Sequence, residues 1–255
     1  MKPKEEMTID QLTVRSSIQI YQADSSIMKP SGFGTGCIVN YLGYTFLLSV
    51  SHVTNKDGLT TFLETNLPPE NNTTHLKPIG DFIWYDIFHI NGPVSQSDFE
   101  DILKHGEKID FTFSKLTEKI ELRQPAIDFG SFNVEESDKV SLNLKYATVP
   151  DKDKTYSFYG KIRPEYQGTY LKMTPTLKNG LKFHKTKGLL HMFLAPEIIR
   201  DKEDYRGCSG APILDSEGRI VALVCSLVTN SKVIYGISIQ ECMKLIKLTI
   251  SSNLL

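Results

Sequence analysis

A short motif near the C-terminal end of the chain carries the clearest chemical signal in the sequence. It reads G-C-S-G-A-P from Gly207 to Pro212, and Ser209 lies between its two glycines. On such a tight turn a serine presents its hydroxyl outward, and the backbone N–H groups of Gly207 and Ser209 converge on one point as an oxyanion hole. The motif predicts acyl-transfer chemistry at Ser209, and the alternative is an ordinary turn.

A serine hydroxyl needs a neighbouring base, and that base needs a group that orients it. His52 directly follows the apolar segment L-L-S-V-S, which is typical of a strand that ends at the rim of a barrel. Asp110 stands in the segment K-I-D-F-T-F, whose apolar residues would partly bury it and so require a partner. We predict His52 as the general base and Asp110 as its orienting carboxylate, with Asp86 as the alternative carboxylate.

The order of these residues along the chain separates the classes of serine hydrolase. The order is histidine, aspartate, serine, whereas subtilisin-type enzymes begin with the aspartate. An α/β-hydrolase needs a histidine after the serine, but the last histidine here is His191. Its nucleophile elbow also ends in glycine, where this chain has Ala211. Both the order and the loop fit the chymotrypsin arrangement.

Four segments resemble those of the trypsin/chymotrypsin-like serine peptidases, in the style of the bacterial Htr/Deg-type and glutamyl-endopeptidase-type branches. They resemble that family's glycine-rich first strand, histidine segment, aspartate segment and nucleophile loop, and they read G-F-G-T-G-C-I-V, S-V-S-H-V, I-D-F-T-F-S-K-L and Y-R-G-C-S-G-A-P-I-L. The resemblance implies an all-β fold of two six-stranded antiparallel β-barrels with the active site between them. Residues 15–120 would form the barrel that carries His and Asp, residues 138–238 the barrel that carries Ser, and residues 239–250 a C-terminal helix.

The same resemblance implies a substrate pocket. Glu203 falls at the bottom of the specificity pocket, six residues before the nucleophile, and Cys225, Ser226 and Leu227 would form the pocket wall and the strand that pairs with substrate. An acidic pocket would favour Arg or Lys at the cleaved position. The alternative is that Glu203 belongs to a solvated acidic loop.

The chain also departs from the family pattern at the nucleophile loop. Cys208 replaces the aspartate that, in zymogen-type members, pairs with a freshly cut N-terminus, so the loop must be held in place by other contacts. Cys208 is also an alternative nucleophile, but it lies one residue before the expected position. Cys225 or Ser226 occupies the place where the family often has a serine beside the triad aspartate.

The elements that must position these residues are mostly short strands. Twelve β-branched and aromatic runs recur between turn residues, which is typical of a sandwich or barrel. A polar stretch over Thr117–Lys139 predicts a linker between two halves. Ser238 and Glu241 have the spacing of a capping box before an apolar run, which predicts the C-terminal helix.

Composition narrows the classes of partner. The 255 residues include 29 Lys and Arg against 30 Asp and Glu, a net charge of −1, so neither nucleic acid nor a membrane surface is expected. No histidine or cysteine spacing suits a metal, and no motif predicts a cofactor. The polar N-terminus lacks an apolar signal segment and no two of the four cysteines form a C-x-x-C pair, so we expect a cytoplasmic protein with free thiols.

The sequence therefore predicts a serine endopeptidase that cleaves a protein or peptide substrate through His52, Asp110 and Ser209. Because a zymogen device is missing, we expect either a narrow target or activation by a protein partner. Two alternatives remain: a catalytically silent trypsin-like fold that serves as a peptide- or protein-binding module, and an esterase that uses the same triad.

Overall fold

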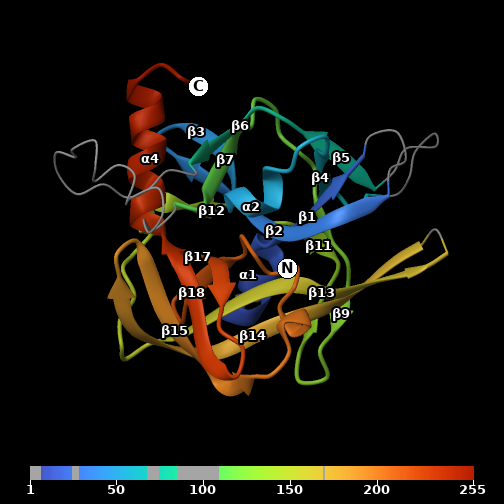
Figure 1. Ribbon diagram of the computed structural model, residues 1–255, viewed down its shortest axis with the longest axis vertical. Coiled ribbons are helices and arrows are strands. Elements are labelled where there is room, and N and C mark those ends of the chain that lie inside the picture. The colour runs from blue at the N-terminus through green and yellow to red at the C-terminus, as the bar shows by residue number, and fades with distance from the viewer. Residues whose placement is uncertain (1–6, 25–28, 68–74, 86–108, 169) are drawn as a thin grey trace, which may run out of the picture.

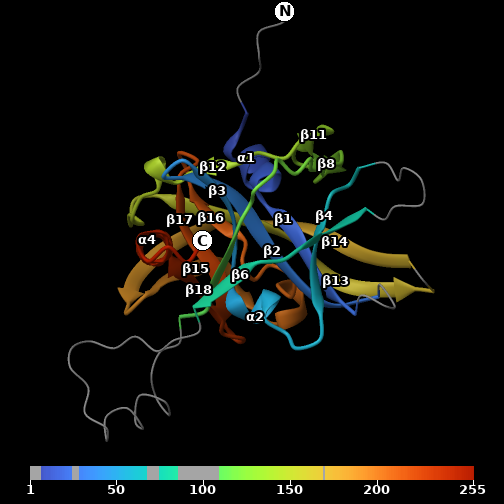
Figure 2. The same ribbon diagram turned by 90° about the horizontal axis from the view of Figure 1, so that it is seen from above.

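The computed structural model describes residues 7–24, 29–67, 75–85, 109–168 and 170–255. Strands dominate these residues and gather in two halves, one built by the first seven strands and the other by the last six (Figure 1). The short helix α2 (Ser51–Thr54) lies on the first half, beside β2 and β6 (Figure 2).

The N-terminal half is one curved, open sheet. Its strands are β1 (Ile18–Ala23), β2 (Pro30–Tyr41), β3 (Tyr44–Ser49), β4 (Thr60–Glu64), β5 (Leu76–Ile79), β6 (Phe82–Tyr85) and β7 (Phe111–Lys115). They lie in the order β5-β4-β1-β2-β3-β7-β6 with antiparallel neighbours, and the short β12 (Leu142–Asn143) adds parallel to β2. Among the described residues this path does not close, so the first half differs from the closed six-stranded barrel that we expected.

The core of the first half holds β3 and β7 side by side. The first four residues of β7 and the last four of β3 are buried, so both strands are covered on both faces there. Leu47, Leu48 and Phe111 are fully buried, and the rings of Phe46 and Phe113 meet edge to face with centroids 5.5 Å apart. Packing of these side chains fixes the end of β3 beside the start of β7.

The segment between the halves has more structure than the polar linker predicted over Thr117–Lys139. Four two-residue strands pair there, β8 (Arg123–Gln124) with β11 (Ser137–Asp138) and β9 (Ile127–Asp128) with β10 (Asn133–Val134), and the 3-10 turn η1 (Leu144–Tyr146) follows them. Phe129 stacks on Phe132 and meets Tyr159 of the second half edge-on. These rings hold the segment against the second half, so its polar composition concealed an ordered connection.

The C-terminal half is a closed barrel. Its elements are β13 (Thr155–Gln167), β14 (Tyr170–Lys187), β15 (Leu190–Ile199), the 3-10 turn η2 (Lys202–Asp204), β16 (Pro212–Asp215), β17 (Ile220–Leu227), β18 (Ser231–Ser238) and then α4 (Ile239–Ser251). The ring order is β13-β14-β15-β18-β17-β16, with a core that includes Tyr156, Phe158 and Phe193. This barrel and the final helix confirm the expected all-β class.

The C-terminal helix contacts both halves. It packs on β17 and β18 (Figure 1). Thr249 near its end hydrogen-bonds Tyr85 of β6 at 2.7 Å. The helix begins after Ser238 as expected, but the Ser238 side chain makes no capping hydrogen bond, and Glu241 instead pairs with Lys244 at 2.7 Å. Burial of the apolar face therefore contributes more to this helix than the predicted capping box does.

A second helix, α1 (Ile9–Ser16), was not predicted. It begins with a capping box, in which the backbone N–H of Gln11 donates to Thr8 Oγ1 and that of Thr8 donates to Gln11 Oε1. It packs on β13 and β16, where Thr13 Oγ1 and Ser157 Oγ are 2.9 Å apart. In the described part of the chain, no helix is both long and apolar enough to cross a membrane.

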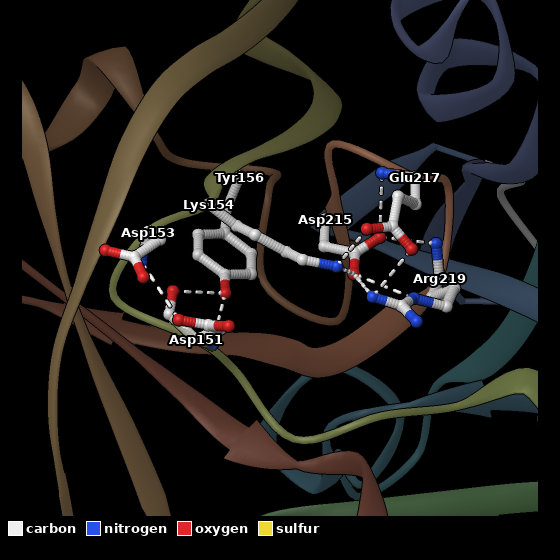
Figure 3. Close-up of polar contacts among 7 residues, drawn as sticks. All are labelled: Asp151, Asp153, Lys154, Tyr156, Asp215, Glu217 and Arg219. Carbon is white, nitrogen blue, oxygen red and sulfur yellow. Dashed lines mark hydrogen bonds and ion pairs between the residues drawn. The ribbon is translucent and has the colours of Figure 1, made fainter.

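The turn that follows the nucleophile loop and β16 is held by a buried carboxylate (Figure 3). Asp215 is 1% exposed, and its Oδ1 accepts the backbone N–H groups of Glu217 and Arg219 at 3.0 and 2.9 Å. Its Oδ2 accepts Arg219 Nη2 at 2.8 Å and Lys154 Nζ at 3.3 Å. Burial by itself would raise the pKa of Asp215, but these donors outweigh it and hold that pKa below its usual range.

We predict that Asp215→Asn lowers the free energy of unfolding by about 3 kcal/mol at neutral pH, because two cations and two amides lose the charge they face. Since the folded pKa is lowered, this contribution is complete above the ordinary aspartate pKa of about 3.9 and disappears as the pH falls through the lower folded value. Urea unfolding of both proteins across pH measures it.

The matched control is Glu217→Gln, because Glu217 belongs to the same network but its side chain is 56% exposed. This control is expected to lose less than about 1 kcal/mol. Equal losses for the two variants would contradict the role given to Asp215.

Candidate active site

His52 projects from a turn that the apolar residues around it hold against the sheet. β3 ends at Ser49, and α2 follows with Val50 and Val53 buried while His52 stays exposed. A methyl group at Gly34 of β2 would lie 2.3 Å from a methyl of Val53, so the turn fits only against glycine. Trp84 Nε1 donates to Thr54 Oγ1 at 3.0 Å and fixes the far end of the turn.

Asp110 reaches His52 because their strands are antiparallel neighbours. Ser49 pairs with Thr112, so the end of β3 lies beside the start of β7, and Asp110 directly precedes β7. Asp110 Oδ2 lies 2.5 Å from His52 Nδ1, and Oδ1 accepts the His52 backbone N–H at 2.9 Å. Asp110 therefore faces Nδ1 of the imidazole, which leaves Nε2 as the ring nitrogen available for proton transfer.

The predicted alternative carboxylate, Asp86, lies outside the described residues. Asp110 accepts two hydrogen bonds from one residue, its side chain is 26% exposed, and the imidazole of His52 is 50% exposed. This bidentate contact fixes both the ring and the backbone of His52, which is the arrangement of an orienting carboxylate.

The nucleophile loop, residues 207–210, carries Ser209 and is fixed by backbone hydrogen bonds. The N–H groups of Cys208 and Gly210 donate to the carbonyls of Tyr205 and Val224 at 2.9 and 2.7 Å. The carbonyl of Cys208 accepts the N–H of Ala211 at 2.9 Å. These bonds leave the loop with one defined backbone path and hold Ser209 at its partly exposed tip.

Two strand residues of the first half complete this framework. Thr35 Oγ1 donates to the carbonyl of Gly207 at 2.6 Å, and the Thr35 N–H donates to the carbonyl of Ser209 at 2.7 Å. Ser49 Oγ in turn donates to the carbonyl of Thr35 at 2.8 Å. The nucleophile loop of the second half is therefore bonded to β2, and Thr35 of β2 is bonded in turn to Ser49 at the end of β3, three residues before His52.

The N–H groups of Gly207 and Ser209 have no acceptor among the described residues. The N–H groups of Cys208 and Gly210, by contrast, donate to protein carbonyls, so the N–H groups of Gly207 and Ser209 remain available to a ligand. Gly207 has φ +111, and a methyl group there would lie 2.2 Å from the carbonyl oxygen of Lys161. Only glycine fits this backbone shape, and the two unpaired donors are what an oxyanion hole requires.

No hydrogen bond joins Ser209 Oγ to the imidazole of His52 within the described residues, although both flank the same junction of loop and strand. A methyl group at Gly210 would lie 2.3 Å from Ser49 Oγ, so the residue after Ser209 is already in contact with the strand that leads to His52. In unliganded enzymes this hydrogen bond is often long and tightens only when substrate binds.

The cysteines of the site are not poised to react. Cys208 is 1% exposed, and burial raises the pKa of its thiol to about 12, so the alternative of Cys208 as nucleophile has no support. Burial also raises the pKa of Cys225 to about 12, and the charge of Asp110 adds to that shift. Cys225 therefore lies near Asp110, and its thiol donates to the carbonyl of Tyr235 at 3.4 Å.

A pocket of about 450 Å³ adjoins Ser209. Its lining consists of Lys202, Glu203, Tyr205, Arg206, Ser209, Val224, Ser226 and Leu227. Three of the four residues predicted to bind substrate are present, whereas Cys225 lies outside the lining. Glu203 is not available as a lone charge, because Arg206 Nη1 lies 3.3 Å from its Oε2 and Lys202 adds a second cation. The pocket is thus not acidic overall, in contrast to the expectation from Glu203 alone.

A second hollow, of about 580 Å³, begins at the same arginine. Its apolar lining includes Phe33, Leu59, Pro164 and Tyr166, and it also contains Arg206. Arg206 is the residue that the two hollows share, so the second hollow adjoins the first. Phe33 precedes Thr35 by two residues and places part of the second hollow on β2, the strand that is bonded to the nucleophile loop.

Three solved structures share this fold. The first is a serine endoprotease from Yersinia pestis, with a TM-score of 0.51 and 13% identity, and the match covers 96% of this chain and 68% of that one. The second is neuropsin, a serine protease expressed in the limbic system of mouse brain, with a TM-score of 0.52, 11% identity and coverage of 91% of this chain and 93% of that one. The third is human heparin binding protein, with a TM-score of 0.52, 9% identity and coverage of 94% of this chain and 93% of that one. No family model and no curated protein matches the sequence. The likeness confirms the trypsin/chymotrypsin-like fold, and because one match is named for binding, the fold does not assign catalysis.

The structure adds residues that sequence reasoning missed. Thr35 bonds the nucleophile loop to the first half, Ser49 holds the Thr35 carbonyl, and Arg206 neutralises Glu203. The motif G-T-G around Thr35 could have indicated the contact of Thr35 with the loop, since glycine inside a strand often marks a site where another backbone approaches closely. No group of three His, Cys, Asp or Glu that suits a metal occurs within the described ranges.

We predict that Gly210→Ala lowers the free energy of unfolding by about 3 kcal/mol, because it adds overpacking to the cost of φ +85. Its methyl group would lie 2.0 Å from the carbonyl oxygen of Thr35. Gly58→Ala is the control, because Gly58 has φ +72 but nothing within 4 Å, and it should lose only about 1 kcal/mol. Similar unfolding midpoints in urea for the two variants would refute the close contact between loop and strand.

Proposed function

We propose that the protein is a serine endopeptidase that uses Ser209 as nucleophile, His52 as general base and acid, and Asp110 as orienting carboxylate. The observation that carries the proposal is the hydrogen-bond pattern of the nucleophile loop, residues 207–210. The N–H groups of Cys208 and Gly210 donate to protein carbonyls, whereas those of Gly207 and Ser209 have no acceptor among the described residues. The contact between His52 and Asp110 supports it independently.

The proposed reaction follows from these positions. Ser209 Oγ attacks the scissile carbonyl and its proton passes to His52 Nε2, while Asp110 stabilises the imidazolium that forms. The N–H groups of Gly207 and Ser209 donate to the oxyanion of the tetrahedral intermediate. His52 then returns the proton to the leaving amine, and a water molecule repeats the sequence on the acyl-enzyme.

The two adjoining hollows favour an endopeptidase. An extended substrate bound at Ser209 would fill the pocket of Glu203 with one side chain and the mostly apolar hollow of Phe33 and Tyr166 with another. Requirements at two positions restrict the target, and the loop is already ordered by the chain's own contacts. These points favour a narrow protein target over activation by a partner.

The free cysteines support a reducing compartment, and we therefore propose that the protein acts in the cytoplasm. All four cysteines are free, and three of them, Cys37, Cys208 and Cys242, are buried. A chain of this fold without a disulfide relies on its two cores for stability.

The second candidate is a binding module that retains the fold without turnover. The missing hydrogen bond between Ser209 and His52 and the fold shared with human heparin binding protein favour it. Such a module would hold an extended peptide along β17 and in the two hollows, and it would not react with electrophiles.

We predict that a fluorophosphonate labels the purified protein at Ser209, because an activated serine reacts with such electrophiles. Ser209→Ala should abolish the labelling. Asp110→Asn should slow it by roughly 10⁴-fold, since the amide no longer fixes the correct tautomer of His52. Labelling rates followed by intact mass measure both effects.

The control for charge alone is Asp138→Asn, an aspartate of β11 whose side chain is 79% exposed. This variant should label at the rate of the unchanged protein. A folded protein that never reacts would establish the binding module in place of the enzyme.

We predict further that Arg206→Gln changes the residue preferred at the cleaved position. Removal of the guanidinium leaves Glu203 as an unpaired carboxylate, so cleavage after Arg or Lys should rise about tenfold relative to cleavage after Gln. Turnover of a peptide library that varies this one position gives the ratio. Arg163→Gln is the control, because Arg163 pairs with Asp204 outside the pocket lining; an equal shift in both variants would contradict the assignment.

A further inference from the structure

The nucleophile loop has a strong need for external support. The peptide that carries the Ser209 N–H is held at its other end by the bond from the Ala211 N–H to the Cys208 carbonyl, and the orientation of both oxyanion donors depends further on the bonds of the neighbouring peptides. Cys208 occupies the position at which the resembling family places a charged aspartate, and its thiol is buried and uncharged. No ion pair within the described residues involves any residue from Gly207 to Gly210.

The hydroxyl of Thr35 takes up that support. It donates to the carbonyl of Gly207 at 2.6 Å, and this carbonyl belongs to the same peptide as the N–H of Cys208, which donates to Tyr205. The peptide between Gly207 and Cys208 is therefore held at both of its polar ends. Rotation of this peptide would break both bonds and would displace the N–H groups on either side of it.

The Thr35 side chain is itself fixed by its surroundings. It is 1% exposed and its carbonyl accepts Ser49 Oγ at 2.8 Å. A methyl group at Gly160 of β13 would lie 3.2 Å from Thr35 Oγ1, so β13 closes the space around the hydroxyl. The hydroxyl is locked between two halves of the molecule and points at a single acceptor.

We propose that Thr35 is a positioning residue, whose hydroxyl preforms the oxyanion hole by holding the Gly207 carbonyl in place of a charged activation contact. The inference rests on the proposed function and deepens it. Because a neutral hydroxyl of the intact chain makes this contact, the site is formed without cleavage of the chain.

The test compares Thr35→Val, which keeps the shape and removes the hydroxyl, with Thr35→Ser, which keeps the hydroxyl. The full chain is reacted with a fluorophosphonate, and the dependence of rate on probe concentration separates the limiting rate from the apparent affinity. We expect the limiting rate of Thr35→Val to fall about 100-fold with little change in affinity, because misplaced donors cost that much. Thr35→Ser should stay within about threefold of the unchanged protein.

Thr65→Val is the matched control, because Thr65 is also buried and its hydroxyl donates to the carbonyl of His75 at 3.0 Å, away from the loop. It should lose stability in urea without loss of rate. If Thr35→Val does not fold, Thr35→Ala supplies the same comparison, since it removes atoms and adds none. A folded Thr35→Val or Thr35→Ala that reacts at the unchanged rate overturns the inference while the proposed function stands; an unchanged protein that does not react overturns the proposed function and the inference with it.

Discussion

The pair of hydrogen bonds from Thr35 to the carbonyls of Gly207 and Ser209 is the interaction on which the site depends. It crosses from the first half of the molecule to the second and sets the direction of every second peptide in the loop. A peptide whose carbonyl faces one way must turn its N–H the other way, because the unit is planar. The N–H groups of Gly207 and Ser209, which lie on neighbouring peptides, are thus left without acceptors among the described residues and can donate to a ligand.

The positions of the other two residues of the proposed triad follow from strand pairing. The end of β3 and the start of β7 are neighbours because an antiparallel ladder joins Ser49 to Thr112, and the residues just beyond them, His52 and Asp110, must then meet. The two halves are also joined near the site by a partly buried contact between Lys161 Nζ and Glu64, to which Tyr21 donates at 2.9 Å. Since the carbonyl of Lys161 lies against Gly207, this contact supports the loop from its other side.

Much of this arrangement could be predicted from the sequence, because strand periodicity and the spacing of glycine and serine are local signals. The contact of His52 with Asp110 was within reach, since both residues adjoin strongly apolar strands. The net charge of the pocket could not be predicted, because the Arg206 side chain reaches Glu203 only once the turn has folded, and no sequence pattern indicates where that side chain points. The open order of the first sheet depends on which edges pair over long distances, and α1 was overlooked although Thr8 and Gln11 have capping-box spacing.

The central claim is that two preformed amides and one serine hydroxyl act on the same carbonyl. A crystal structure of the protein reacted with phenylboronic acid tests this most directly, since a boronate bound to a serine is tetrahedral and carries an oxygen in the place of the oxyanion. The account predicts boron bonded to Ser209 Oγ, with one boronate oxygen within about 3 Å of the N–H groups of both Gly207 and Ser209. A boronate bound elsewhere, or one whose oxygens all face solvent while those amides point away, would contradict it.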